Sequence, residues 1–350
     1  MKRNETDGQN QVLYVGIDIH KRTWHVTGVF ENGVEAFSVS MEAETAVLVR
    51  YLERWRHLRI EAVYEAGYYG YWLHDELEEH GIHCMVTPPS LVPGEYGNRV
   101  KTDRRDSRKL AMYGAKGLLK RVYVLTPEER CHRQVLRTRR QLIADRKRKQ
   151  CQIKAFLAQY GMPLPDTSGP WTRTFVTFLH RIRFADNWLQ KCFDQLLNGH
   201  ESVNRQVQEQ TDMIRELAQH EKYRDRVALL RRIPGIGLLI AMELLLELQD
   251  VERFRTGDEL AAYVGLTPSQ YSSGDHVRMG HITRIGKPEL RGAMIEAAWV
   301  YVRKDKHAAE TYATIRTRAG GKRAIVAMAR RMLLLSRSVL INRTSFVPAV

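Results

Sequence analysis

Four carboxylate side chains stand where segments of regular structure should end or begin. Asp18 ends the apolar stretch VLYVGID, and Glu65 ends a second one in IEAVYEAG. Asp103 and Asp106 are three residues apart in KTDRRD, so at the opening of a helix they share one face and add negative charge to its N-terminus. Each acid alone could equally be a surface residue or a helix cap.

Taken together, the four acids indicate a metal site. Carboxylates gathered without compensation repel one another, and a hard divalent cation neutralises them. Mg²⁺ is the expected ion, with Mn²⁺ as a substitute. Two such ions could activate an attacking oxygen and stabilise a leaving one, which is the chemistry of phosphoryl transfer.

The elements that must position these acids form the pattern of a mixed sheet flanked by helices. We expect strands over residues 12–19 and 23–30, joined as a hairpin, and over 60–67 and 82–88. We expect helices over residues 43–55, 68–81 and 106–119. This α/β domain, residues 1–126, ends near Thr126 and Pro127.

A long helix is expected from Pro127 to Tyr160, because no further Gly or Pro occurs before its end and proline fits a first helical position. Its apolar residues recur at near-heptad spacing, which predicts a partly coiled helix. A second helix from Glu201 to His220 has similar spacing and could pair with it in one chain or across protomers. Residues 127–222 are therefore predicted to be a helical coiled-coil segment for oligomerisation and nucleic-acid contact.

The long helix is strongly basic. Between residues 128 and 154, ten Lys or Arg stand against three acids, which leaves +7 of the chain's +15. A solvated helix face is the common explanation of a charge run. Because acids are nearly absent here, we expect contact with a nucleic-acid backbone instead. The cations chosen for this contact are Arg139, Arg140, Arg146, Lys147, Arg148 and Lys149.

Residues 223–350 are expected to form a mainly α-helical domain. The sequence Ile-Pro-Gly-Ile-Gly at 233–237 predicts a tight turn before an apolar helix, as in a helix-hairpin-helix. In that motif, turn amides such as those at Gly235 and Gly237 hold a phosphate. A helix-turn-helix used only for packing has the same pattern. A Gly-rich and Ser-rich loop and helices over 289–303 and 322–341 should follow.

Composition narrows the partners. The 350 residues suffice for two or three domains, and a 43% hydrophobic content can form a core in each. The 55 Lys and Arg outnumber the 40 Asp and Glu, so a polyanion is the first partner to expect. No apolar run of membrane-spanning length occurs and the start is polar, so we expect a cytoplasmic protein without membrane contact. The four cysteines lack a CxxC pair, which argues against a zinc knuckle or a disulfide framework.

Several motifs together resemble those of a known family. GIDIHK, YEAG and KTDRRDSRKLA resemble the DEDD motifs of a RuvC-like domain, which has an RNase H-like fold. GLTPSQYSSGDHVRMGHITRIGKPELR resembles the signature of a C-terminal transposase domain. In this order, over nearly the whole chain, they resemble the DEDD-type insertion-sequence transposases related to the Piv DNA invertases, a family of bridge-RNA-guided recombinases. One departure is Ser107, where alanine is usual, and it should be harmless.

The resemblance implies a DNA transposase or site-specific recombinase with two groups of catalytic residues. Asp18, Glu65, Asp103 and Asp106 match the metal-binding acids, and Ser273 matches the nucleophilic serine. A serine that attacks a phosphodiester leaves a phosphoserine ester, which retains the energy needed for rejoining. We therefore expect no need for ATP, and no Walker loop occurs in the sequence. Ser272 is the alternative nucleophile, and a plain turn is the alternative role of this segment.

The same resemblance implies the partners. They are double-stranded donor and target DNA and a non-coding guide RNA whose loops pair with both, while the protein reads backbone and shape. We expect a homo-oligomer, a dimer or a tetramer on DNA, associated with the bacterial nucleoid when active. Near Ser273, the cations expected to contact nucleic acid are Arg278, Arg284 and Lys287.

Two other functions fit part of the sequence. A RuvC-like structure-selective endonuclease acting by hydrolysis would use the same acids and have no use for Ser273. A nucleic-acid-binding scaffold with an inactive catalytic fold is disfavoured, because all four acids are present. Recombinant joints, nicked ends or binding alone would separate the three.

Overall fold

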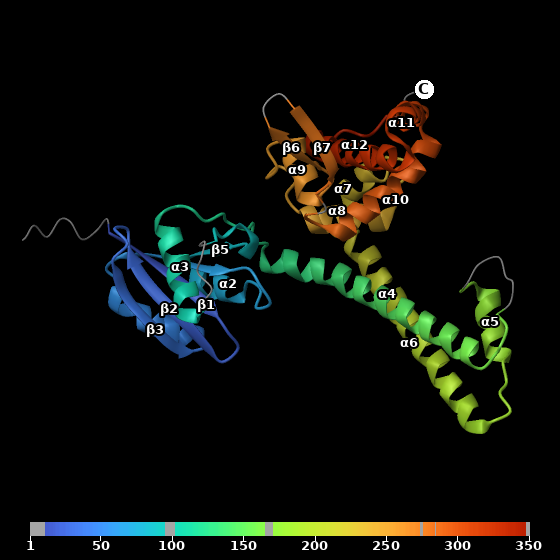
Figure 1. Cartoon of the computed structure of the whole chain (residues 1–350), viewed down its shortest axis with the longest axis horizontal. Helices are drawn as coiled ribbons and strands as arrows, with labels where there is room; N and C mark the ends of the chain where they lie inside the picture. The colour runs from blue at the N-terminus through green and yellow to red at the C-terminus, as the bar shows by residue number, and fades with distance from the viewer. Residues whose placement is uncertain (1–10, 95–101, 165–170, 274–275, 284, 348–350) are drawn as a thin grey trace, which may run out of the picture. The chain divides into compact units, whose positions relative to one another are not determined.

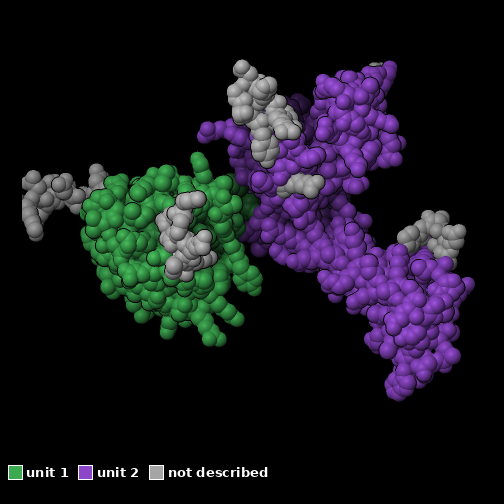
Figure 2. All heavy atoms as spheres, in the orientation of Figure 1, with its two compact units in different colours: residues 1–125 green, residues 126–350 purple. Residues whose placement is uncertain are grey.

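The computed structural model describes residues 11–94, 102–164, 171–273, 276–283 and 285–347, and none of the side chains from 271 to 279 (Figure 1). The chain divides into two compact units, Met1–Leu125 and Thr126–Val350 (Figure 2). The first is a mixed α/β domain, and the described part of the second is helical apart from a two-stranded sheet. A further division of the second unit after residue 222 stays a prediction.

The first unit is built on a five-stranded sheet in the order β3-β2-β1-β4-β5. The predicted hairpin consists of β1 (Val12–Ile19) and β2 (Thr23–Phe30), and β3 (Glu35–Glu42) extends it as an antiparallel edge strand. On the other side, β4 (Arg59–Glu65) and β5 (His83–Thr87) run parallel to β1. This mixed sheet is consistent with a RuvC-like fold, as expected.

Helices cover both faces of this sheet. On one face, Leu13, Val15 and Ile17 of β1 are buried in one cluster with Leu48 and Leu73. These two leucines belong to α1 (Thr45–Leu52), which a 3₁₀ turn η1 (Glu53–Trp55) continues, and to α2 (Trp72–Glu79). A second 3₁₀ turn, η2 (Pro89–Leu91), follows β5. Since side chains alternate along a strand, Gly16 faces the other way, toward α3 (Asp103–Ala115).

The contact between α3 and the sheet is unusually close. A Cβ atom added to Gly16 would stand 2.0 Å from the backbone oxygen of Ser107 and 2.6 Å from the backbone nitrogen of Ala111. Glycine at this position therefore lets α3 rest on β1. The side chain of Ser107 is fully buried, its hydroxyl donates to the carbonyl of Arg104 at 3.1 Å, and its Oγ lies 2.8 Å from Thr27 Oγ1. The Ser107 hydroxyl therefore has hydrogen-bond partners within the contact between α3 and the sheet.

Two long helices dominate the start of the second unit. α4 (Pro127–Gln159) and α6 (Asn187–Leu217) pack side by side in one chain, and α5 (Arg173–Arg181) lies between them in sequence (Figure 1). They are antiparallel, since Arg139 bonds to Thr211 and Arg146 to Asn204. α6 begins well before the predicted start at Glu201. Coiled-coil geometry and dimerisation stay predictions.

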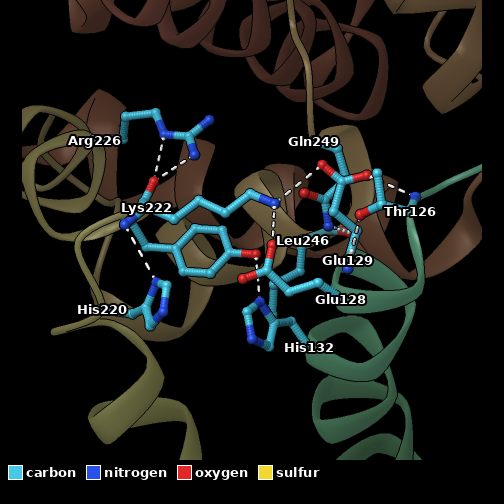
Figure 3. A network of polar contacts seen from close by, with 10 residues as sticks. Thr126, Glu128, Glu129, His132, His220, Lys222, Arg226, Leu246 and Gln249 are labelled. Atoms are coloured by element: carbon cyan, nitrogen blue, oxygen red, sulfur yellow. Dashed lines mark hydrogen bonds and ion pairs between the residues drawn. The ribbon is translucent and has the colours of Figure 1, made fainter.

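A polar network fixes the base of this helical hairpin (Figure 3). Thr126 and Glu129 form a capping box at the first turn of α4. The Nζ of Lys222, in the segment after α6, donates to Glu128 Oε2 at 3.0 Å and to Glu129 Oε1 at 3.2 Å (Figure 3). Beside them, His132 Nδ1 lies 2.9 Å from the hydroxyl of Tyr223. The two ends of the hairpin are thereby held together.

The remaining helices share one large core. The helices are α7 (Arg224–Leu230), α8 (Leu238–Leu248), α9 (Gly257–Val264), α10 (Pro288–Lys304), α11 (Lys306–Ala319) and α12 (Gly321–Asn342). The segment predicted as a loop instead contains an antiparallel pair, β6 (Pro268–Ser273) and β7 (His276–Ile282). Strand pairing overrides the low strand propensity of its Gly and Ser residues. Among the described helices, none has the length and apolar character that a membrane span requires.

The glycine-containing turn before α8 packs into this core. Gly235 has a φ of +95°, and a Cβ there would lie 2.3 Å from the backbone oxygen of Ala297 in α10. Ile233 and Ile236 beside it are buried. These are the contacts of a packing turn, and phosphate binding at Gly235 and Gly237 stays a prediction.

Candidate active site

The register of the sheet sets two of the predicted acids next to each other. In the parallel pair β1 and β4, Ile17 lies opposite Tyr64. One residue further along each strand are Asp18 and Glu65, so both acids stand at the same edge of the sheet. They also share the face of the sheet toward α3. Gly16 and Val63 contact this helix, and Asp18 and Glu65 follow them by two residues, which returns to the same face of a strand.

The helix α3 brings two more acids to this edge. Thr102 caps the helix by accepting a hydrogen bond from the backbone N–H of Arg105, and Asp103 and Asp106 lie in the first turn. The His20 Nε2 is 3.2 Å from Asp18 Oδ2 and 3.5 Å from Asp103 Oδ1. One ligand atom from each of these three residues lies within 4.8 Å of the others. They form a cluster that could hold a metal ion.

The raised pKa of Asp18 shows that its burial and its negative neighbours are not fully balanced. Burial raises the pKa of Asp18 above its usual value, His20 lowers it, and the negative charges of Asp103 and Asp106 raise it again. The net pKa is raised, so the protein by itself does not fully compensate the carboxylate. An oxygen-rich donor set with unbalanced negative charge suits a hard divalent cation.

His20 is the residue that sequence reasoning missed. It stands one residue beyond β1, inside the motif GIDIHK, and its ring reaches both Asp18 and Asp103. A histidine two residues after an acid that ends a strand is the only local signal, and it is weak. Its place between two carboxylates suits either an additional ligand or a donor that orients them.

A chain of hydrogen bonds next to the cluster links β2 and β3 to α3. His25 lies opposite Asp18 in the hairpin, with its Nδ1 2.8 Å from Ser40 Oγ and its Nε2 2.9 Å from Ser38 Oγ. From Ser38 the chain continues to Thr27 at 3.1 Å, and from Thr27 to Ser107 of α3. Burial and then the charge of Arg104 lower the pKa of His25. Through these hydroxyls, His25 ties the hairpin to the helix that carries Asp103 and Asp106.

The predicted serine belongs to the second unit. Ser273 is the last residue of β6, and its backbone pairs with that of His276. The side chains of Ser272, Ser273 and Arg278 lie outside the described side chains, and Arg284 lies outside the described residues. Lys287 lies 3.6 Å from Glu247 Oε2, with its Nζ 5.7 Å from the centroid of the Tyr263 ring.

The cations predicted on α4 separate into two groups. Arg140 reaches α8, where it donates to Glu247 Oε1 at 2.6 Å and Glu243 Oε1 at 2.7 Å. Arg139 Nε donates to Thr211 at 2.8 Å, and Arg146 donates to Asn204 at 3.2 Å. The stem of Lys149 passes Gly199, with its Cε 3.6 Å from the place of an added Cβ. Lys147 and Arg148 are exposed, and Arg148 pairs with Asp145 one turn away on its own helix.

Comparison with known proteins gives matches at both ends of the chain. A transposase family profile for the DEDD domain of IS110 elements matches residues 15–162, and the profile of the Transposase IS116/IS110/IS902 family matches residues 227–313. The first match covers Asp18, Glu65, Asp103 and Asp106, and the second covers Ser273.

Individual relatives are similar over most of their length. The protein y4qE of Sinorhizobium fredii is 29% identical, over 82% of this chain and 71% of its own. The transposase for insertion sequence element IS1533 of Leptospira borgpetersenii is 26% identical, over 82% of this chain and 84% of its own. The pilin gene-inverting protein of Moraxella bovis is 27% identical, over 95% of this chain and 97% of its own.

Proposed function

The chain belongs to the IS110/IS116/IS902 family of DEDD transposases, and we propose that it cleaves and rejoins DNA at a divalent metal site formed by Asp18, Glu65, Asp103 and Asp106. The observation that carries this proposal is the cluster of Asp18, His20 and Asp103 at the edge where β1 and β4 end. Similarity to a protein named for inverting a pilin gene supports rearrangement of DNA rather than hydrolysis alone.

We propose that Mg²⁺, or Mn²⁺ in its place, is the ion. Asp18 and Glu65 would hold it from the strand ends, and Asp103 and Asp106 from the first turn of α3. When bound, a divalent ion activates an attacking oxygen and neutralises charge on the phosphate. His20 donates a hydrogen bond to Asp18 and so fixes the direction in which that carboxylate points.

We propose Ser273 as the nucleophile. Its Oγ forms a bond to phosphorus while the bond from phosphorus to the leaving sugar oxygen breaks, and the serine proton passes to that oxygen. Attack by the hydroxyl of another strand then makes the new phosphodiester and restores the serine. The position of Ser273 within the region matched by the second family profile supports this role.

Covalent trapping tests the serine directly. After reaction with labelled DNA and denaturation, digestion of the wild type should yield a labelled peptide whose adduct maps to Ser273, and Ser273→Ala should yield none. An adduct on Ser272, or normal rejoining by Ser273→Ala, would contradict the assignment.

We further propose that a non-coding RNA guides the enzyme and that an oligomer assembles on DNA. The acids and the serine belong to different units of the chain, and we propose that they act together on one phosphodiester in an assembled complex. The exposed cations Lys147 and Arg148 suit backbone contact with RNA or DNA. Sequencing the RNA that copurifies with the protein tests guidance: one abundant species from the flanking DNA is expected, and a random mixture would contradict it.

Analysis of reaction products tests the function as a whole. Incubation with donor and target DNA, the copurifying RNA and Mg²⁺ should give recombinant joints. Nicked ends without joints would instead favour a hydrolytic endonuclease, and binding without any cleavage would favour an inactive scaffold.

A further inference from the structure

A loop rich in aromatic residues follows the acid cluster. It connects β4 to α2 over residues 66–71 and contains Tyr68, Tyr69 and Tyr71, with Trp72 beginning the helix. The side chain of Tyr68 is 98% exposed and that of Trp72 is 41% exposed. Tyr68 is thus an almost completely solvated aromatic residue only three positions after Glu65.

The loop is anchored although Tyr68 is exposed. The Tyr64 hydroxyl donates to the carbonyl of Gly70 at 3.0 Å, and the Ala66 N–H donates to the carbonyl of Thr87 at 2.7 Å. The Trp72 ring packs against the buried Trp24, with centroids 5.9 Å apart. Among the rings that the structure describes, that of Tyr68 meets only that of Tyr69, in a T-shaped pair with centroids 5.6 Å apart. An aromatic ring held out on a fixed loop has an open face for a partner.

The position of the loop indicates the partner. It starts at the edge of the sheet that carries Asp18 and Glu65, and Trp72, which follows it, contacts Trp24 near the start of β2. The preceding turn from β1 holds two exposed cations, Lys21 and Arg22. Acids that suit a metal, cations that suit phosphates and an exposed aromatic ring thus come from adjacent segments of one sheet edge. Together they match a nucleic-acid strand, whose bases stack on aromatic rings and whose phosphates attract cations.

We infer that Tyr68 stacks on an unpaired base of the DNA strand beside the phosphodiester that is cleaved. This inference rests on the proposed function and specifies its substrate as DNA with locally unpaired bases. Stacking uses the flat face of any base, so the contact favours unpaired over paired DNA without reading a particular sequence. The open ring of Tyr68 needs no hydroxyl for this role.

The test compares Tyr68→Ala, Tyr68→Phe and a matched control. Trp188→Ala removes another exposed aromatic side chain, 72% exposed on α6, outside the proposed site. The full-length protein is titrated against two DNA duplexes that share one strand carrying 2-aminopurine. In one duplex this base is paired and in the other it is mispaired, and stacking quenches its fluorescence. Thermal unfolding of each variant confirms that the fold is intact.

The wild type, Tyr68→Phe and Trp188→Ala should quench the probe and bind mispaired DNA equally well. Tyr68→Ala should quench less and bind the mispaired duplex about fivefold to a hundredfold more weakly, with unchanged affinity for the paired duplex. Equal binding of mispaired DNA by Tyr68→Ala, or equal losses on both duplexes, would overturn the inference alone. A wild type that binds neither duplex would overturn the proposed function together with it.

Discussion

The backbone oxygen of Ser107 lies 2.0 Å from the point that a Cβ atom on Gly16 would occupy. Gly16→Ala must therefore push α3 away from β1, and with it Asp103 and Asp106. We expect this single methyl group to destabilise the first unit by about 1–3 kcal/mol, the usual cost of overpacking. DNA cleavage should be lost, because the acids at the start of α3 move away from Asp18.

Gly114→Ala is the matched control for this change. Gly114 is also a glycine on α3, but its added Cβ would make ordinary contacts, 3.6 Å from Val63 and 3.7 Å from Tyr14. Replacing a glycine inside a helix by alanine stabilises by up to about 1 kcal/mol. Thermal unfolding and cleavage assays of the two variants should diverge, and equal behaviour would show that close packing at Gly16 does not matter.

The raised pKa of Asp18 makes the stability of the metal-free protein depend on pH. Between the ordinary aspartate pKa of about 3.9 and the raised one, the folded state binds more protons than the unfolded state. The free energy of unfolding therefore falls as pH rises through this window and stays lower above it. Asp18→Asn removes the effect and should be more stable than the wild type at neutral pH.

Thermal unfolding in chelator at pH 4 and pH 7 measures this difference. The wild type should lose more stability than Asp18→Asn between the two pH values. Adding Mg²⁺ at pH 7 should raise the unfolding temperature of the wild type and leave that of Asp18→Asn nearly unchanged. Parallel curves for both proteins would contradict the account of an uncompensated acid cluster.

Arg140 is expected to stabilise the folded protein rather than to bind nucleic acid. Glu247, one of its partners, is only 3% exposed, so Arg140→Met leaves a buried carboxylate short of a partner. Burial lowers the pKa of Arg140 and the two carboxylates raise it by more, which keeps the guanidinium charged. Removal should cost about 3–5 kcal/mol. Denaturant unfolding checks this, and Arg137→Met, at an exposed position of the same helix, should change stability little.

Lys147 and Arg148 are expected to act through nucleic-acid affinity. Lys147→Gln with Arg148→Gln should lower the log–log dependence of DNA affinity on salt by about 0.9 for each phosphate that the variant no longer neutralises. The control is Arg50→Gln with Arg56→Gln, which removes an equal charge from the first unit. Binding titrations from low to physiological salt measure this slope for both double variants. An unchanged slope would show that Lys147 and Arg148 face solvent and do not contact DNA.

Much of the first unit can be predicted from the sequence because apolar alternation and strand-end acids are local signals. The strands β1, β2 and β4 lie where VLYVGIDI, TWHVTGVF and IEAVYE predict them. β3 is missing from the prediction, although EAFSVSME alternates Phe37, Val39 and Met41 with polar residues as a half-buried strand does. Likewise, no separate helix is predicted over α5 or the first part of α6, which form where their apolar faces find a shared cluster.

The candidate site, too, could be predicted from the sequence only in part. The two strand-end acids follow from local pattern, whereas the role of His20 depends on the approach of Asp103 from a helix more than eighty residues away in sequence. The charge run on α4 is visible in the sequence, yet nothing local reveals that Arg140 pairs with carboxylates 103 and 107 residues away. Contacts between distant segments decide which charges stay free.

Strand cleavage by single acid variants shows whether the acid cluster catalyses the reaction. Asp18→Asn, Asp103→Asn and the exposed control Glu79→Gln are each assayed on duplex DNA from the flanks of the gene, with copurifying RNA and Mg²⁺ or excess chelator. The wild type and Glu79→Gln should cleave in Mg²⁺ and not in chelator, and neither Asp18→Asn nor Asp103→Asn should cleave although both still bind DNA. Full cleavage in chelator, or by either aspartate variant, would contradict catalysis by the cluster.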